Sequence, residues 1–296
     1  MTIFSQAFTR AALRPLKWIG RMSLGRARRV TGWLGQPLRL LMRRRARIVD
    51  RNLELCFPEL NHPERKRLAR AHFRNLAESI GEIAFAWHHP GPLDDSVGTV
   101  EGLEHLQAAR ADGRGVLLVT AHVTCLELGA RVLGRHVDGC GIYRPLRNQA
   151  LERMQNEGRS RYARAMLARD DLRAMVRELR AGGVLWYAPD QDPGRRRARF
   201  APLFGVQAAT ATGMLELARL GRARVVPMFP LKEAGSGRIR VILEPAFENF
   251  PSEDPSADLA RYNAFIERHV RAAPATYWWL HRRFKTRPKG QPDPYR

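Results

Sequence analysis

A histidine and a glutamate stand five residues apart where an apolar stretch gives way to a helical pattern. The apolar stretch that begins at Val116 predicts a strand, and the change to helical spacing falls near Thr120 to Thr124. His122 is therefore expected at the carboxyl end of a strand, and Glu127 in the first turn of the following helix. Because ligands of open α/β sheets bind at that end of the strands, the imidazole and the carboxylate could form a hydrogen-bonded general base there.

The pair is not specific by itself, because two common residue types at this spacing recur in many proteins. In the alternative interpretation His122 binds a backbone carbonyl and Glu127 caps its helix. The rest of the sequence has to distinguish a general base from these structural roles.

A second group of polar residues follows another predicted strand. Residues 184–188 are apolar and lead into Asp190, Gln191 and Asp192. These side chains are expected at the same sheet edge as His122, where they could bind substrate or support the general base.

Arginines follow this acidic group. Arg195 and Arg196 precede an apolar stretch that ends at Gly205, a combination expected where an amphiphile with an anionic head is bound. For any one of these arginines a solvated surface position is the simpler interpretation. Arg159, in the preceding predicted helix, has no distinguishing feature in the sequence alone.

Strand-like and helical patterns alternate from residue 97 onward, which predicts an α/β fold with a mostly parallel central sheet flanked by helices. Strands are expected at residues 115–120, 139–144, 184–188, 224–231 and 238–243, and helices at 124–136, 148–168, 171–181, 210–220 and 257–271. Gly182 and Gly221 stand where helix C-caps are expected. Ahead of the sheet, one helix should end at Pro58 and another should begin at Pro63.

The charge of the chain calls for an anionic partner. Its 296 residues can bury a full core, and 51 Lys and Arg against 29 Asp and Glu give a net charge of +22. Nucleic acid, acidic phospholipid and a phosphorylated substrate all fit this excess. The first 50 residues hold twelve of the basic residues and one acidic residue, so half of the excess lies there.

Residues 1–50 are predicted to be a basic amphipathic segment that lies on a membrane. Apolar and basic residues recur at helical spacing on different faces. The apolar set is Phe4, Phe8, Ala11, Pro15, Trp18, Ile19 and Met22, and the basic set is Arg10, Arg14, Lys17 and Arg21. The sequence has no run of about eighteen apolar residues, so a transmembrane helix is not expected. A solvated arm that binds nucleic acid is the alternative.

Other chemistries lack their usual residues. The sequence contains no Gly-x-Ser-x-Gly, Gly-x4-Gly-Lys or His-Glu-x-x-His motif, which argues against a serine hydrolase, a nucleotide triphosphatase and a zinc protease. Three cysteines without metal-ligand spacing fit a reducing compartment. Cys125 has the helical spacing of a core residue rather than a nucleophile. The adjacent His88 and His89 are followed by loop residues, which does not favour a metal site.

Four blocks of sequence together resemble the secondary, or late, acyltransferases of lipid A biosynthesis, the lauroyl and myristoyl transferases of Gram-negative bacteria. The blocks are residues 52–58, residues 120–127, residues 190–194 with Phe204-Gly205 and Ala209-Thr210, and residues 274–285. They occur in order across most of residues 48–290. The resemblance is therefore far more specific than the His-x4-Glu pattern alone.

The resemblance implies a glycerolipid-acyltransferase-like domain over residues 51–296. Its reaction would transfer a fatty acyl chain from acyl carrier protein to a hydroxyl of a lipid A precursor, at the cytoplasmic face of the inner membrane. It implies no cofactor, no metal and no nucleic acid. His122 would be the general base and Glu127 would orient and charge-stabilise it, while Arg159 and Asp190 match further polar positions of the family.

The N-terminus departs from this pattern. Members of the family commonly begin with a hydrophobic membrane helix, whereas this chain has an amphipathic segment rich in arginine. The sequence does not fix the donor chain length, the hydroxyl that is acylated or a need for Kdo sugars. An acyltransferase for another glycolipid or aminolipid is the nearest alternative. A basic nucleic-acid-binding protein is more remote, because it explains the charge but not the four blocks.

Overall fold

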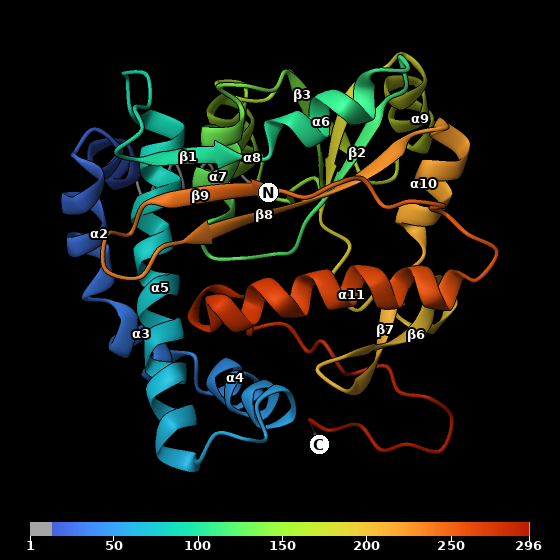
Figure 1. The fold of residues 1–296 in the computed structure, drawn as a ribbon. Coiled ribbons are helices and arrows are strands. Elements are labelled where there is room, and N and C mark those ends of the chain that lie inside the picture. Colours follow the sequence, from blue (N-terminus) through green and yellow to red (C-terminus); the bar gives the residue numbers. More distant parts are fainter. Residues whose placement is uncertain (1–13, 296) are drawn as a thin grey trace.

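The computed structural model describes residues 14–295, which form a central sheet surrounded by helices (Figure 1). Within these residues the main sheet has seven strands in the order β1-β9-β8-β2-β5-β3-β4, and β6 and β7 form a separate hairpin. The strands are β1 (Gly98–Glu101), β2 (Val116–Val119), β3 (Gly139–Tyr143), β4 (Ala165–Ala168), β5 (Val184–Tyr187), β6 (Ala198–Leu203), β7 (Val206–Ala211), β8 (Arg224–Lys232) and β9 (Ile239–Leu243). Neighbouring strands of the main sheet are parallel except β8 and β9. The predicted fold class is confirmed.

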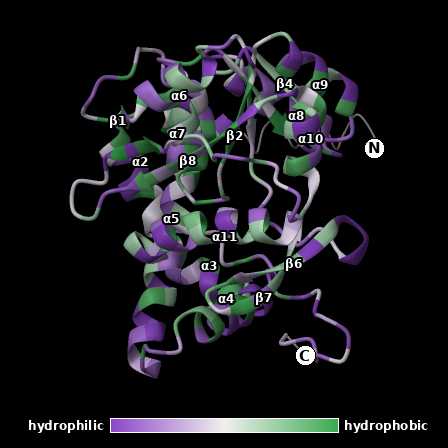
Figure 2. Ribbon diagram, turned by 45° about the vertical axis from the view of Figure 1, so that its right-hand side comes forward, coloured by the Kyte–Doolittle hydropathy of each residue, from purple (hydrophilic) through white to green (hydrophobic). Residues whose placement is uncertain are grey.

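The helices bury one face against the sheet or against each other, and Figure 2 shows both hydrophobic and hydrophilic residues along them. They are α2 (Leu24–Gly32), α3 (Gly35–Leu41), α4 (Arg43–Cys56), α5 (His62–His88), α6 (Leu103–Arg110), α7 (Leu126–Leu133), α8 (Gln149–Arg159), α9 (Leu172–Arg180), α10 (Gly213–Gly221) and α11 (Pro255–Ala272). Single 3-10 turns occupy Arg195–Arg197 and Pro274–Thr276, and helical backbone also covers residues 14–20.

Helix α5 is the longest element, with 27 residues. It begins with a capping box, in which the Asn61 side chain accepts from the Glu64 backbone N–H and the Glu64 carboxylate accepts from the Asn61 N–H. The predicted start at Pro63 is one residue late, and α4 ends at Cys56, as the predicted stop at Pro58 requires. Because α5 packs against α2, α3, α4, α7 and α8, it links the N-terminal helices to the sheet.

Strands β2 and β5 lie side by side at the centre of the sheet. All four residues of β2 are buried, and Val119 pairs with Tyr187 in parallel register. The next residue continues the ladder, because the Thr120 N–H donates to the Tyr187 carbonyl at 2.9 Å. The segments that follow the two strands therefore leave the same edge of the sheet together, as the sequence predicts.

The structure differs from the predicted elements in three places. The helix predicted over residues 148–168 ends at Arg159, and Ala165–Ala168 forms β4 instead. Ala198–Leu203 and Val206–Ala211 form the β6–β7 hairpin, and Gly98–Glu101 forms β1, and none of these was predicted as a strand. β1 and β4 are four-residue edge strands, and β6 and β7 lie outside the main sheet. Their partial exposure leaves only a weak hydrophobic pattern in the sequence.

The two glycines at helix ends have different roles. Gly182 follows α9 with a φ of +79°, which fits the predicted C-cap. At the end of α10 the left-handed residue is Arg222, with a φ of 53°, and not Gly221. A Cβ on Gly221 would lie 2.7 Å from the Cβ of Leu179, so this glycine serves the close packing of α10 on α9.

Part of the predicted N-terminal wheel, namely Phe4, Phe8, Arg10 and Ala11, lies outside the described residues. Helices α2 and α3 pack against α5. Helix α4 crosses residue 50, where the sequence analysis divides the chain. The division into a membrane segment and a catalytic part stays a prediction.

A buried arginine fixes the C-terminal end of α5. Arg131 of α7 is 7% exposed, and its guanidinium donates to four carbonyls around the end of α5. These belong to Phe85 and Ala86 at 2.9 Å, His89 at 3.1 Å and Gly91 at 2.8 Å. Burial lowers the pKa of Arg131 to about 10, which still leaves the side chain charged at neutral pH.

Replacing this arginine should destabilise the protein strongly. Arg131→Met is expected to lower the free energy of unfolding in urea by about 3 kcal/mol or more, because buried carbonyls lose their donors. Arg135→Met, two residues beyond the end of α7, is the matched control. Arg135 makes a longer bond to the Gly98 carbonyl and an exposed ion pair with Asp95, so the loss should stay below about 1 kcal/mol. Equal losses would contradict the role of Arg131.

Candidate active site

The turn that carries His122 is held by the C-terminal part of the chain. The Trp278 N–H donates to the His122 carbonyl at 3.0 Å, and the Thr124 N–H donates to the Thr276 carbonyl at 2.7 Å. These bonds fix the backbone on both sides of the imidazole. The position of His122 thus depends on residues far from it in the sequence.

The side chain of His122 is bound to the carboxylate of Asp190. Nδ1 lies 2.5 Å from Oδ1, and the backbone N–H of His122 donates to Oδ2 at 3.1 Å. A carboxylate only accepts, so Nδ1 carries the proton and Nε2 of the neutral ring keeps its lone pair. Asp190 is buried, whereas a third of the His122 side chain is exposed. The predicted meeting of these two residues at one sheet edge is confirmed.

Each member of this pair shifts the pKa of the other. Burial alone would lower the pKa of His122, but the Asp190 carboxylate more than offsets it, and the net pKa is raised. Burial alone would raise the pKa of Asp190, but the imidazole and the backbone N–H of His122 outweigh it, and the net pKa is lowered. The charged form of the pair is therefore favoured over a wider pH range than for separate side chains.

Glu127 lies in a different cluster, in the first turn of α7. Its carboxylate accepts from Nε and Nη2 of Arg159, from the Tyr162 hydroxyl at 2.5 Å and from Nε1 of Trp87 at 3.0 Å. Burial would raise the pKa of Glu127, but the Arg159 guanidinium and the three donors lower it overall. Burial likewise opposes the charge of Arg159, and Glu127 raises the pKa of Arg159 in return.

The expected direct contact between His122 and Glu127 is wrong. Within residues 14–295 the imidazole is hydrogen-bonded to Asp190, and Glu127 is occupied by Arg159, Tyr162 and Trp87. The two clusters are still electrostatically coupled, because the charge of Arg159 acts to lower the pKa of His122. Four of the predicted site residues, His122, Asp190, Glu127 and Arg159, thus form two ion pairs.

A glycine permits the second cluster. A Cβ on Gly158 would lie 2.3 Å from Cγ of Trp87, so any larger residue would push the indole away. Gly158 precedes Arg159 at the end of α8, and Trp87 is near the end of α5. The close approach of these two helices brings both donors to Glu127.

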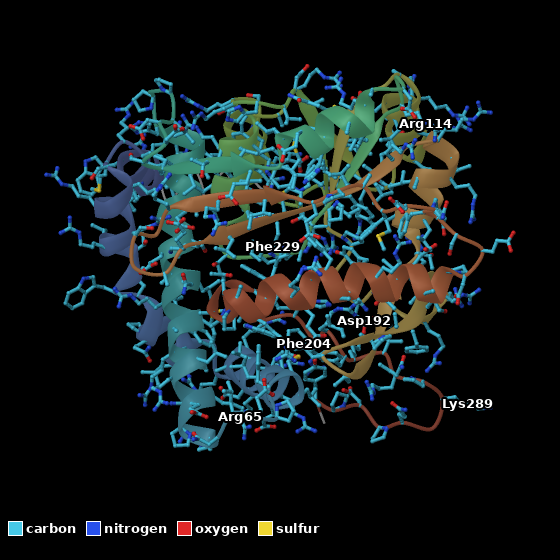
Figure 3. All side chains as sticks on the ribbon, viewed as in Figure 1. Arg65, Arg114, Asp192, Phe204, Phe229 and Lys289 are labelled. Atoms are coloured by element: carbon cyan, nitrogen blue, oxygen red, sulfur yellow. The ribbon has the colours of Figure 1, made fainter. Side chains whose placement is uncertain are left out.

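The loop after Asp190 turns back toward the C-terminal segment, and Figure 3 labels Asp192 in this region. The Asp192 carboxylate accepts from the N–H groups of Gly194 and Thr286. The Asp192 carboxylate therefore shapes the loop rather than contacting the pair of His122 and Asp190.

The other predicted residues of this loop are Gln191, Arg195 and Arg196. Arg195 donates to the carbonyl of Arg287, Arg196 is exposed and Gln191 is half-buried. Within residues 14–295 the side chains of Gln191, Arg195 and Arg196 make no hydrogen bond to His122 or to the Asp190 carboxylate. Their predicted roles in substrate binding stay predictions.

Residues 7–286 match the family described as bacterial lipid A biosynthesis acyltransferase. The chain is 39% identical to the lipid A biosynthesis lauroyltransferase of Escherichia coli K12, over 97% of this chain and 98% of that protein. It is 38% identical to the palmitoleoyltransferase of the same organism, over 88% and 86%, and 28% identical to its myristoyltransferase, over 92% and 83%. The chain belongs to the bacterial lipid A biosynthesis acyltransferases.

The four sequence blocks of this acyltransferase are joined to one another by hydrogen bonds. Asn52, from the first block, donates to the carbonyls of Trp279 and His281 in the fourth. His281 in turn accepts from the N–H of Asp192 in the third block. The turn around His122, in the second block, is bonded to the fourth block as described above. The blocks are therefore parts of one site.

Two residues of the acyltransferase site were missed by the sequence reasoning. Arg283 is buried and donates to the Ala209 carbonyl and to Oγ1 of Thr210, and its charge helps to lower the pKa of Asp190. Tyr277 is also buried, and its pKa is raised well above the usual value by burial and by Asp190. Both lie in the fourth block, but one arginine within a basic tail gives no sign that it is buried.

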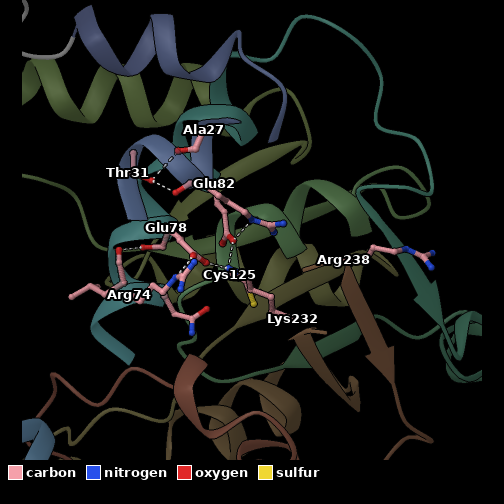
Figure 4. Close-up of polar contacts among 12 residues, drawn as sticks. Ala27, Thr31, Arg74, Glu78, Glu82, Cys125, Lys232 and Arg238 are labelled. Atoms are coloured by element: carbon pink, nitrogen blue, oxygen red, sulfur yellow. Dashed lines mark hydrogen bonds and ion pairs between the residues drawn. The ribbon is translucent and has the colours of Figure 1, made fainter. Parts of the chain in front are cut away.

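Cys125 is part of the core, as predicted. Its thiol is fully buried and donates to the Pro230 carbonyl at 3.4 Å. Burial, with a smaller effect of Glu82, raises the pKa of Cys125 to about 12, so the thiolate is not available near neutral pH. Figure 4 shows Cys125 beside the ion pairs of Glu82 and Lys232.

From residue 14 to residue 295, no group of three or more His, Cys, Asp and Glu side chains could hold a metal ion. Over the same residues, no helix combines the length and the apolar content needed to cross a bilayer.

The pKa of His122 in the acyltransferase should depend on Asp190. In the wild type, the imidazole should titrate above the usual value for histidine, and in Asp190→Asn it should titrate below that value, because burial remains while the opposing charge is lost. Nuclear magnetic resonance of the ring nitrogens measures both curves. Identical curves would show that Asp190 does not hold the imidazole.

Proposed function

We propose that this protein transfers a fatty acyl chain from the thioester of an acyl carrier protein to a hydroxyl of a lipid A precursor, with His122 as the general base. Nε2 of His122 removes the proton of the acceptor hydroxyl as its oxygen attacks the thioester carbonyl. Asp190 holds the ring in the tautomer that leaves Nε2 free and stabilises the imidazolium that forms. The attack yields a tetrahedral oxyanion.

The second half of the reaction returns the proton. The C–S bond breaks as the carbonyl re-forms, and the leaving thiolate takes the proton from Nε2 of the imidazolium. The products are an ester on the lipid and a free thiol on the carrier, and the enzyme is unchanged. Arg159 provides the positive charge that stabilises the oxyanion, and Glu127 holds the guanidinium in place through two N–H donors.

The observation that carries this proposal is the environment of His122. A histidine that is hydrogen-bonded through Nδ1 to a buried carboxylate, and still one-third exposed, has the geometry of a general base. A histidine of purely structural role would have both nitrogens occupied or would be fully buried. The direct transfer also needs no nucleophile on the protein, in keeping with the buried thiol of Cys125.

Substitutions in the two ion pairs should lower acyl transfer without unfolding the protein. His122→Gln and Asp190→Asn are each expected to reduce kcat by about a hundredfold or more, because the base is lost or held in the wrong orientation. Glu127→Gln should reduce kcat by a similar factor through Arg159. Transfer of labelled laurate from acyl carrier protein to a tetra-acylated lipid A precursor measures these rates. Near-normal activity of His122→Gln would overturn the mechanism.

Cys125→Ser is the matched control in the same turn. It should keep most of the activity, and mass spectrometry of the wild type during turnover should find no acyl group on this cysteine, because transfer is direct. Acylated Cys125 would show a two-step mechanism instead.

We also propose that residues 18–47 contact the cytoplasmic face of the inner membrane. Of the large apolar residues that are exposed within residues 14–295, most lie between Trp18 and Leu41. Trp33 is 85% exposed, Leu41 is 83% exposed and Leu40 is 67% exposed. Arg43, Arg44 and Arg47, which follow directly, are also exposed. Apolar side chains next to arginines are typical of a surface that binds anionic lipid.

The exposed leucines of α3 should therefore control vesicle binding. Leu40→Ser with Leu41→Ser is expected to weaken binding to anionic vesicles by at least about tenfold, because two side chains no longer enter the acyl boundary. The matched control is Leu172→Ser with Leu220→Ser, which removes two exposed leucines elsewhere on the protein. Flotation measures binding of both. Equal loss in the two double variants would show that α3 is not the membrane contact.

A further inference from the structure

A hollow lies next to the ion pair of His122 and Asp190. An open hollow of about 430 Å³ is lined by residues 192–194, by Arg45 of α4 and, from the C-terminal segment, by His281, Arg282, Lys285 and Thr286. Asp192 on its wall is two residues from Asp190 in the sequence, so the hollow adjoins the candidate active site. We propose that it binds a phosphate ester carried by one of the two substrates, an inference that rests on the proposed function for the identity of the ligand.

The charge of the hollow suits a phosphate. Arg45, Arg282 and Lys285 contribute three positive charges, and Asp192 is the one acidic residue of the lining. Both oxygens of the Asp192 carboxylate already accept backbone N–H groups, from Gly194 at 2.8 Å and from Thr286 at 2.7 Å. The net charge of the lining is therefore positive, and its carboxylate is engaged in folding the loop. Arginine and lysine together are the usual ligands of phosphate oxygens.

Two of the three cations have a contact at the wall, and among the described residues the third has none. Nη1 of Arg45 donates to the Leu280 carbonyl at 3.1 Å, which leaves Nη2 outside this bond. The guanidinium of Arg282 stacks over the ring of Tyr295 at 5.8 Å from its centroid. The ammonium of Lys285 makes no hydrogen bond or ion pair within residues 14–295. The three basic side chains thus line a space that can hold a phosphate group.

His281 adds a neutral donor to the same wall. The Asp192 N–H donates to Nε2 of His281 at 2.9 Å, so Nε2 is unprotonated and the ring proton resides on Nδ1. Burial lowers the pKa of His281, which keeps the ring neutral. Asn52 fixes the backbone here by donating to the His281 carbonyl. A hydrogen bond from Nδ1–H would orient a phosphate oxygen that the cations attract.

Both substrates of the proposed reaction can carry such a group. A carrier protein presents its thioester on a phosphopantetheine arm, which contains a phosphodiester, and a lipid A precursor carries phosphates on its sugars. In either case a phosphate held in the hollow would fix one end of the substrate at a set distance from Nε2 of His122. The group that the two substrates share is a phosphate ester.

Direct binding is tested with inorganic phosphate. The ring signals of His281 should shift as phosphate is titrated into the wild type at constant ionic strength, and chloride should not reproduce the shift. Lys285→Gln should weaken the apparent affinity at least about fivefold. Lys289→Gln is the matched control, because it removes the same charge from an exposed lysine of the same tail that does not line the hollow (Figure 3). No phosphate-dependent shift in the wild type would overturn the site.

The source of the phosphate is tested by kinetics. The donors are lauroyl-phosphopantetheine and lauroyl-pantetheine, and the acceptors are lipid A precursors with and without phosphates. Lys285→Gln should lower kcat/KM about tenfold for the phosphorylated member of one pair and leave its unphosphorylated partner unchanged, whereas Lys289→Gln should change neither. A loss confined to the donors assigns the hollow to the carrier arm, and a loss confined to the acceptors assigns it to the sugar phosphate.

The outcomes separate the two proposals. Phosphate binding without any acyl transfer would leave the phosphate site standing and reject the proposed reaction. Acyl transfer in which Lys285→Gln behaves like Lys289→Gln for all four substrates would support the reaction and overturn the substrate phosphate site.

Discussion

The site depends on one buried carboxylate, that of Asp190 after β5, which needs hydrogen-bond donors and a balancing charge. An ionised Asp190 in the protein interior is costly unless its oxygens are hydrogen-bonded and its charge is balanced. The ring and the backbone N–H of His122 donate hydrogen bonds to the two carboxylate oxygens. The charge of Arg283 lowers the pKa of Asp190 further. These partners come from the turn after β2 and from the C-terminal segment. The convergence of distant sequence blocks thus follows largely from the need to satisfy one charge.

The second buried carboxylate explains why His122 and Glu127 do not pair. If Glu127 turned to the imidazole, the largely buried guanidinium of Arg159 would lose its counter-charge, and Trp87 and Tyr162 would lose their acceptor. Two carboxylates with two separate cations avoid this cost. The arrangement also tunes the base, because Asp190 raises the pKa of His122 while the charge of Arg159 lowers it. The imidazole is therefore kept closer to its ordinary pKa than Asp190 alone would allow.

The sequence predicts that His122 and Asp190 lie at one edge of the sheet. It does not predict which side chains form hydrogen bonds with each other. His122 and Asp190 follow buried strands, and parallel neighbours β2 and β5 bring such positions to one edge. The partner of each side chain depends on helix packing, such as the approach of Gly158 to Trp87, and no local pattern encodes it. Arg283 was missed for the same reason. The edge strands β1 and β4 were missed because strands of four residues that are mostly half-buried show little periodicity.

Helix α5 joins the proposed membrane surface to the site. In its C-terminal part, Glu82 is buried and bonds to Arg28 of α2 at 2.7 Å and to Lys232 of β8 at 2.8 Å. Figure 4 shows Glu78 entering the same cluster, and it bonds to Lys232 at 2.6 Å. Buried charges tolerate few alternative arrangements, because each must keep its partners.

This cluster therefore fixes the orientation of α2 on α5, and with it the exposed face around Trp33. Near the end of the same helix, Trp87 donates to the carboxylate of Glu127. A continuous helix of 27 residues is about 40 Å long and stiff. A membrane contact near α2 and α3 would thus hold the active site at a set height above the lipid surface, which suits an enzyme whose acceptor stays in the bilayer.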